Sequence, residues 1–196
     1  MHNNAKQAST TPADLSTNPP SPTTTMSKSV TNFTGQLVTF TTSVPYAEVI
    51  TRLETALHKE TSSAKWFPAM RAAKSKEDVE KALHDIIGND DFIYFLQLPM
   101  HWVNFFKPGT GSVIVYVIGN PVIAQTMMVE DIRVAFNIPP RILVVGKENG
   151  QGTEIHYHLP SAVYAIDDNP ALKTAALILD EKLEAFIRKI TAESSM

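Results

Sequence analysis

The run Val113–Ile118, which reads VIVYVI, is the sequence feature that most constrains the fold. All six residues are apolar or aromatic, and five of them are β-branched, which favours an extended strand. A strand without polar alternation is buried on both faces. The run therefore predicts an interior strand of a sheet, and the rest of the chain has to supply the layers that bury it.

Residues 141–159 predict a β-hairpin. Two strand-like segments, Arg141–Val145 and Thr153–Leu159, flank the dipeptide Asn149-Gly150, which is the strongest short-range hairpin signal. We therefore centre the turn between these two residues. This register puts two pairs on a buried face, Ile142 with Tyr157 and Val144 with Ile155, and two pairs on the other face, Arg141 with His158 and Leu143 with His156.

Apolar periodicity and turn residues divide the remaining chain into further elements. Strands are expected at Phe33–Val44 and Phe92–Leu98, and helices at about residues 45–57, 75–87, 121–136 and 170–191. Residues 61–74 are expected to be irregular, with Trp66, Phe67 and Met70 packed on the core. Strands paired as hairpins, with helices on one face, make an α+β domain. The last helix carries a heptad-like apolar seam, which suits a core helix better than a dimer seam, and both alternatives stay open.

Composition separates the first 30 residues from the rest of the chain. They contain four prolines, six threonines and five serines but few large apolar side chains. Such a segment cannot bury enough surface to offset the entropy lost on ordering. We expect a disordered tail at residues 1–30 and a single α+β domain at residues 31–196.

Charge, cysteine content and missing motifs exclude several classes of protein. A net charge of −3 disfavours nucleic-acid binding through phosphate neutralisation. The absence of cysteine rules out disulfides, thiolate zinc sites and cysteine nucleophiles. No apolar run has membrane-spanning length and the first residues do not read as a secretory leader, so we expect a cytoplasmic chain with no membrane partner. The motifs of the common hydrolases, zinc proteases, nucleotide kinases and dinucleotide-binding dehydrogenases are missing, and no cofactor is expected.

Polar side chains at one end of the predicted sheet form the first candidate site. If the strands at 113–118 and 141–145 are antiparallel, Asn120, Arg141 and His158 converge there. The Arg141 guanidinium beside the His158 imidazole can bind a carboxylate, enolate or phenolate, and the first N–H groups of the helix at Pro121 favour an anion as well. The alternatives are a surface pair for Arg141 and His158 and a helix cap for Asn120.

Two further clusters are candidates. Glu154, His156 and His158 alternate on one face of a strand, a spacing that metal sites use, although the polar side of a half-buried edge strand has the same pattern. The second cluster is an aromatic segment with one histidine, which can wall an apolar pocket or fill the core. Its members are His101, Trp102, Phe105 and Phe106, with Met127 as a candidate for the same cavity.

Several short signals together resemble the domain of unknown function family 302. They are Gly119-Asn120-Pro121, Met127, the run from Pro139 to Val144, a glycine turn, Tyr157 and Pro160, within a stretch of roughly Phe33–Ala192. His101-Trp102 and the insertion around Trp66–Gly88 look like the larger, fungal-type members. The resemblance implies an antiparallel sheet in strand–helix–four-strand–helix order, similar to half of the TATA-binding protein, with an inserted helix. It implies no reaction and no cofactor, and the residues it carries over are architectural: Gly119, Asn120, Pro121, Pro140, Arg141, Tyr157 and Pro160.

Three functions follow as hypotheses. The first is a small-molecule-binding domain with its pocket between the sheet and the aromatic segment, able to catalyse a cofactor-free lyase, isomerase or cyclase step by acid–base chemistry. Its expected catalytic residues are His101, Arg141 and His158, and its expected ligand-binding residues are Trp102, Phe105, Asn120, Met127, His156 and Tyr157. The second is a non-catalytic homodimeric binding or regulatory module that uses the last helix. The third is a metal-binding protein centred on His156 and His158.

Overall fold

The computed structural model of the protein describes residues 26–193. The chain divides into two units, Met1–Asn32 and Phe33–Met196. The tail expected at residues 1–30 lies outside the described residues as far as residue 25, and residues 26–32 contain no helix or strand. All elements described below belong to the second unit.

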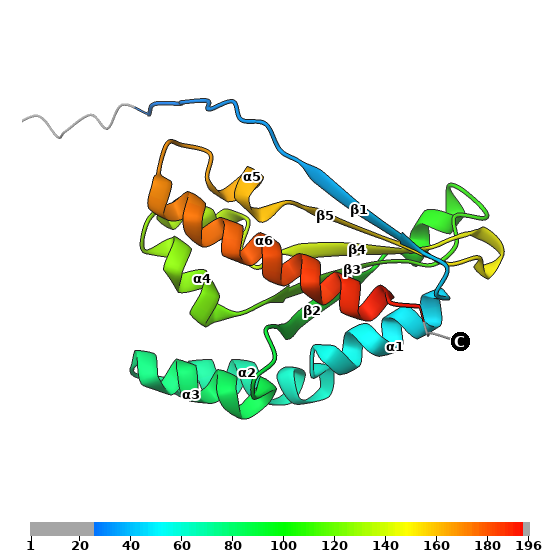
Figure 1. Ribbon diagram of the computed structural model, residues 1–196, viewed down its shortest axis with the longest axis horizontal. Helices are drawn as coiled ribbons and strands as arrows, with labels where there is room; N and C mark the ends of the chain where they lie inside the picture. Colours follow the sequence, from blue (N-terminus) through cyan, green and yellow to red (C-terminus); the bar gives the residue numbers. More distant parts are fainter. Residues whose placement is uncertain (1–25, 194–196) are drawn as a thin grey trace, which may run out of the picture. The chain divides into compact units, whose positions relative to one another are not determined.

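The second unit is an α+β domain built on one five-stranded antiparallel sheet (Figure 1). Its elements in chain order are β1 (Leu37–Thr42), α1 (Tyr46–Ala56), α2 (Lys59–Ala72), α3 (Lys76–Ile87), β2 (Ile93–Pro99), η1 (His101–Phe105), β3 (Val113–Gly119), α4 (Pro121–Met128), η2 (Ile132–Phe136), β4 (Arg141–Gly146), η3 (Glu148–Gly150), β5 (Thr153–His158), α5 (Pro160–Tyr164) and α6 (Pro170–Thr191). The strands lie in the order β1-β5-β4-β3-β2. The expected α+β fold with an antiparallel sheet is confirmed; α2 and α3 are inserted before β2, and α4 and η2 lie between β3 and β4.

The β4–β5 hairpin has the predicted register. Ile142 pairs with Tyr157 and Val144 with Ile155, and all four side chains are buried on the same face of the sheet. The turn between the strands contains the short helical turn η3. Because side chains alternate along a strand, the correct register also fixes which polar residues lie on the opposite face.

The main core lies between this face of the sheet and α1, α4, α5 and α6. Strand β3 is an interior strand, as predicted, and contributes Ile114, Tyr116 and Ile118 to the core. The expected burial on both faces is only partly met, because Val115 is buried on the other face but Val113 and Val117 are half-buried. Figure 1 shows α6 lying across the strands. Its apolar seam is buried within this chain, which confirms the core-helix alternative; the seam residues are Leu172, Ala176, Leu179, Leu183, Phe186, Ile187 and Ile190. Within residues 26–193, no helix has the length and hydropathy needed to cross a membrane.

The expectation of an irregular segment at residues 61–74 is wrong, because Lys59–Ala72 forms helix α2. The sequence of this helix is mainly polar and shows no helical apolar pattern. It also contains Pro68 in its interior, which cannot donate a backbone hydrogen bond. Tertiary packing supports it instead: Trp66 is buried against Phe95 of β2, with ring centroids 6.0 Å apart. By contrast, Phe67 is about half exposed.

Helices α2 and α3 form a second, smaller core with the edge strand β2. Leu83, Ile86 and Ile87 of α3 pack with Trp66 and with Ile93. An edge strand has unpaired backbone groups that can pair with other chains. The insertion therefore packs against the first half of β2, around Ile93 and Phe95.

The helix expected at residues 121–136 is two pieces, α4 and η2, separated at residues 129–131. Asp131 begins the second piece, because its carboxylate accepts a hydrogen bond from the backbone N–H of Arg133 at 2.8 Å. Apolar periodicity continued through this break, so the sequence pattern did not reveal it. The bend between the two pieces forms one wall of the cavity described next.

Candidate functional site

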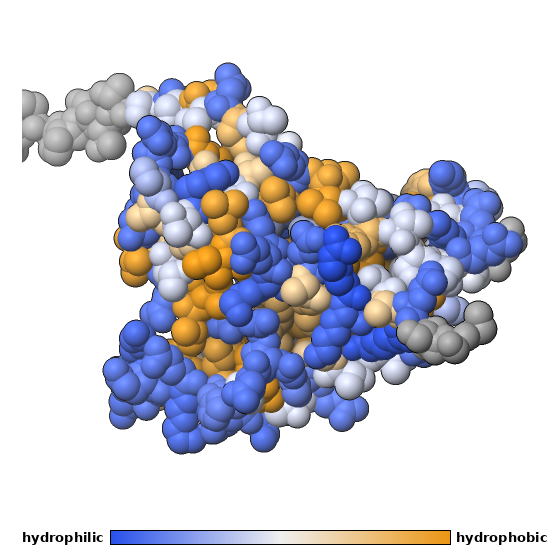
Figure 2. All heavy atoms as spheres, viewed as in Figure 1, coloured by the Kyte–Doolittle hydropathy of each residue, from blue (hydrophilic) through white to orange (hydrophobic). Residues whose placement is uncertain are grey.

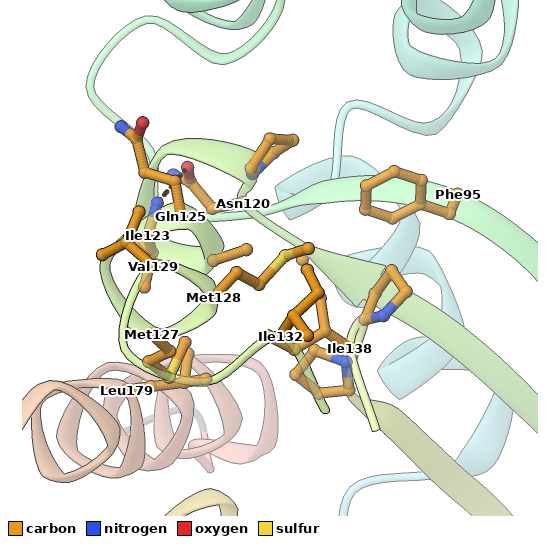
Figure 3. Close-up of a pocket in the computed structure, with 15 residues that line it drawn as sticks. Phe95, Asn120, Ile123, Gln125, Met127, Met128, Val129, Ile132, Ile138 and Leu179 are labelled. Atoms are coloured by element: carbon orange, nitrogen blue, oxygen red, sulfur yellow. Dashed lines mark hydrogen bonds between the residues drawn. The ribbon is translucent and has the colours of Figure 1, made fainter. Parts of the chain in front are cut away.

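An apolar cavity of about 430 Å³ lies at the end of β3, beneath the bend between α4 and η2 (Figure 3). Phe95 of β2 and Leu179 of α6 contribute to it from two other elements. In Figure 3 the side chain of Met128 reaches from α4 across the cavity towards Phe95. The remaining lining residues are Gly119, Asn120, Pro121, Ile123, Ala124, Gln125, Met127, Val129, Ile132, Ile138, Pro139 and Pro140.

None of the described residues that line the cavity has an ionisable side chain. The wall consists of aliphatic, aromatic and thioether groups, with Asn120 and Gln125 as its amides. Methionine side chains adapt to irregular shapes because they are unbranched and flexible, and Met127 and Met128 both contribute here. The arrangement can surround an apolar molecule, but it offers no counter-charge to an ion.

Apolar residues also continue on the surface around this cavity. Val129, Ile132 and Phe136 are 77%, 68% and 93% exposed. Figure 2 shows hydrophobic residues gathered over α4 and the start of α6. A large exposed apolar patch marks an interaction site more often than a random surface does.

Asn120 holds the N-terminus of α4 at the edge of the cavity. Its Oδ1 accepts hydrogen bonds from the N–H groups of Val122 and Ile123, at 2.9 and 3.2 Å, and its Nδ2 donates to the carbonyl oxygen of Asp91 at 2.8 Å. These contacts correct the expectation that the first N–H groups of the helix bind an anion, since two of them already have a partner. The helix-cap alternative accounts for Asn120.

Arg141 and His158 lie at the same end of the sheet as Asn120, as predicted, because β3 and β4 are antiparallel. In the register of β4 and β5, Arg141 lies opposite His158, one residue further along than the pair Ile142–Tyr157. Both side chains are exposed, on the face of the sheet away from the core. The structure therefore brings the pair together but places it outside the apolar cavity.

His101 lies at the opposite end of the sheet from Arg141 and His158. It begins η1 directly after β2, next to the start of β3, whereas Arg141 pairs with Val117 near the end of β3. At about 3.4 Å per residue, the length of β3 separates the two ends by about 20 Å. The three expected catalytic residues are thus not assembled into one site.

The aromatic segment does not wall the cavity either. Trp102 is 50% exposed, and Phe105 and Phe106 are 82% and 81% exposed. Of the expected ligand-binding residues, Asn120 and Met127 line the cavity. Lining residues that the sequence did not predict include Phe95, Ile132, Ile138 and Leu179. The signal available for the bend was Asp131, a helix-capping residue type inside an otherwise apolar stretch.

His156 and Tyr157 point to opposite faces of β5. The Nδ1 atom of His156 and the Thr39 hydroxyl lie 2.9 Å apart, and His156 Nε2 lies 3.5 Å from a Glu154 oxygen. Tyr157 lies in the core against Phe40, where burial raises its pKa to about 12. Among residues 26–193, no group of three or more His, Cys, Asp or Glu side chains is placed to hold a metal ion.

The fold and the cavity together define an α+β domain with a single antiparallel sheet and an uncharged hollow at one end of it. The family model described as "Domain of unknown function DUF302" matches residues 107–190, a narrower range than the resemblance suggested. A protein of known structure from Bacillus stearothermophilus, described as an uncharacterized conserved protein DUF302, has a similar fold. Its TM-score is 0.55 and its sequence identity 20%, over 80% of this chain and 98% of the other. Residues 107–190 therefore match the DUF302 family, and the fold of the chain is similar to that of a DUF302 protein.

The matched residues contain β3 to β5, α4 and most of α6, and therefore most of the cavity wall. The inserted helices α2 and α3 and the aromatic segment lie outside them. No curated protein matches the chain.

Proposed function

We propose that the domain binds a small, uncharged and largely apolar molecule in the cavity beneath α4 and η2. The observation that carries the proposal is the wall itself, a hollow of about 430 Å³ lined by residues without a single ionisable side chain. This volume lies within the range of about 300–1,000 Å³ typical of ligand sites. Burying an ionised group without a partner costs far more than apolar contacts return, so an uncharged ligand is favoured.

Binding, rather than acid–base catalysis, is the function that these observations support. A cofactor-free lyase, isomerase or cyclase needs a proton donor or acceptor within hydrogen-bond reach of the ligand. His101, Arg141 and His158 lie outside the lining of the cavity. The catalytic part of the first hypothesis therefore has no geometric support at this site.

Tryptophan fluorescence can test the proposal, because Trp66 lies against Phe95, which lines the cavity. The chain has two tryptophans, so a Trp102→Phe variant leaves Trp66 as the only emitter. Titration with 1-decanol should change its emission and saturate. Sodium decanoate at alkaline pH, with the same chain length but a charged head, should bind at least about tenfold more weakly.

A pair of variants locates the site. Ala124→Leu adds bulk inside the cavity and should weaken decanol binding by about tenfold or more. Ala135→Leu adds the same bulk at an exposed position of η2 and should leave binding unchanged. The proposal fails if decanol produces no saturable change, if decanoate binds equally well, or if the two variants behave alike.

A further inference from the structure

The face of the sheet away from the core is unusually apolar for a face exposed to solvent. Because Ile114, Tyr116 and Ile118 point into the core, the alternate residues of β3 point the other way. Their neighbours on β2 and β4 are aliphatic as well, and Leu96 and Leu98 are 42% and 41% exposed. We call this set the open sheet face; it consists of Leu96, Leu98, Val113, Val115, Val117, Leu143 and Val145. The two leucines of β2 are exposed, Val115 is buried among its neighbours, and the other four side chains are half-buried.

An antiparallel sheet with one solvated face normally carries polar residues on that face. That pattern holds here only on β1 and β5, which present Thr39, Thr41, Glu154, His156 and His158. The aliphatic part spans the three adjacent strands β2, β3 and β4, and the charged residue on this face of β4 is Arg141, which pairs by register with Val117. Such a surface is favoured to pack against another apolar surface.

The dimensions of the sheet suit a second copy of this chain. Five strands at about 4.8 Å spacing and about 20 Å length make a planar area of about 480 Å² on each copy. Two copies together bury about 960 Å², close to the roughly 1,000 Å² in total that a specific interface needs. Two sheets stack face to face in this way at about 10 Å in β-sandwiches. The last helix offers no rival seam, because its heptad-like residues are already buried in the core.

Charge on the polar flank is also self-complementary. Arg141 is exposed, and within residues 26–193 it forms no ion pair. Glu154 lies at the opposite end of the neighbouring strand, paired by register with Val145, and its carboxylate lies 3.5 Å from His156 Nε2 and 3.9 Å from Lys147 Nζ. A two-fold axis parallel to the sheet and perpendicular to the strands lays the Arg141 end of one copy over the Glu154 end of the other.

We propose that the open sheet face is the interface of a homodimer. The aliphatic side chains of β2, β3 and β4 form its centre, and two symmetry-related pairs of Arg141 with Glu154 of the second copy fix the orientation. This arrangement is isologous, as in most two-fold dimers. The interface lies on the opposite side of the sheet from the ligand cavity, so it does not depend on the proposed function.

Sedimentation velocity of the full-length chain over a range of micromolar concentrations tests this proposal with a matched pair of variants. Leu98→Lys places a charge in the open sheet face, and Leu177→Lys places one on the exposed side of α6; the two leucines are 41% and 45% exposed. The wild type and Leu177→Lys should sediment as dimers, and Leu98→Lys should raise the dimer dissociation constant by about tenfold or more. A urea melt of each variant checks that the substitution leaves the fold intact.

Charge reversal supplies a second readout that a folding defect does not mimic. Arg141→Glu should weaken the dimer, and Arg141→Glu combined with Glu154→Arg should restore it. A wild type that stays monomeric at every concentration would overturn the proposal. Loss of the dimer in Leu177→Lys but not in Leu98→Lys would assign the interface to the apolar surface around α4 and α6 instead.

Discussion

Tyr116 and Glu54 form a polar contact that joins β3 to α1. Tyr116 is fully buried, and its hydroxyl donates a hydrogen bond to Glu54 Oε1 at 2.6 Å. Lys59 donates to the same oxygen at 2.5 Å. Desolvation alone would raise the pKa of Glu54, but the hydrogen bonds from Lys59 and Tyr116 outweigh it and lower the pKa below its usual value of 4.5.

Removing the Tyr116 hydroxyl should therefore destabilise the fold. We expect Tyr116→Phe to lower the free energy of unfolding by about 1–2 kcal/mol at neutral pH, because a hydrogen bond to a charged acceptor is lost and the acceptor is only partly exposed. Urea unfolding measures the loss. Tyr94→Phe is a matched control, since Tyr94 packs edge-on against Tyr116 with ring centroids 6.3 Å apart, and its effect should be below about 0.5 kcal/mol.

The pH dependence of the Tyr116→Phe effect is part of the same prediction. A carboxylate whose pKa is lower in the folded state stabilises the protein above its unfolded pKa, and this contribution is lost as the pH falls through the folded value. The gap between wild type and Tyr116→Phe should therefore narrow below about pH 4.5. A gap that is constant with pH would show that Glu54 is not the relevant acceptor.

Two of the helices begin with the same dipeptide, Asn-Pro, but their caps differ. Asn120 accepts two backbone hydrogen bonds and donates one to Asp91. Asn169 accepts one, from the N–H of Leu172 at 3.0 Å, at the start of α6. The cap of α4 therefore also ties this helix to the loop before β2, next to the ligand cavity.

This difference predicts unequal costs for the same substitution. Asn120→Ala should lower the free energy of unfolding by about 2 kcal/mol, against about 1 kcal/mol for Asn169→Ala. Urea unfolding of the two variants at neutral pH makes the comparison. Equal losses would mean that the bond to Asp91 contributes nothing beyond ordinary helix capping.

The elements also differ in how well their sequences predicted them. The β4–β5 hairpin was predicted to its register because Asn149-Gly150 and the alternation of Ile142 and Val144 are local signals that agree. Helix α2 was not predicted, because it is stabilised by the packing of Trp66 on Phe95. These two residues are 29 positions apart in the chain. Long-range packing of this kind overrides local propensity and leaves no periodic signature.

The candidate site follows the same rule. Asn120 and Met127 were predicted because an Asn-Pro cap and an apolar helix are visible in the sequence. Phe95 and Leu179 reach the cavity only through the pairing of β2 with β3 and the packing of α6. His101 and Arg141 lie at opposite ends of the sheet because of the directions of β2, β3 and β4. The sequence pattern did not determine these directions.

At the scale of the whole molecule, the core is notable for its tyrosines. Burial raises the pKa of Tyr116 and Tyr164 well above the usual 10.0 and raises that of Tyr157 to about 12, with the carboxylates of Glu184 and Asp180 adding to the effect at Tyr157. These residues come from β3, α5 and β5. Ionising any of them would place an uncompensated negative charge between the sheet and its helices.

The tyrosines predict that the domain loses stability in alkali. A group whose pKa is higher in the folded state contributes fully below its unfolded pKa, near 10 for tyrosine, and its contribution falls as the pH rises towards the folded value. Between about pH 10 and 12 each such tyrosine should remove up to about 1.4 kcal/mol of unfolding free energy per pH unit. Urea unfolding from about pH 8 to 11 measures the slope. Tyr157→Phe should make the slope of unfolding free energy against pH shallower by the contribution of one tyrosine. An unchanged slope would show that Tyr157 ionises equally readily in the folded and unfolded chains.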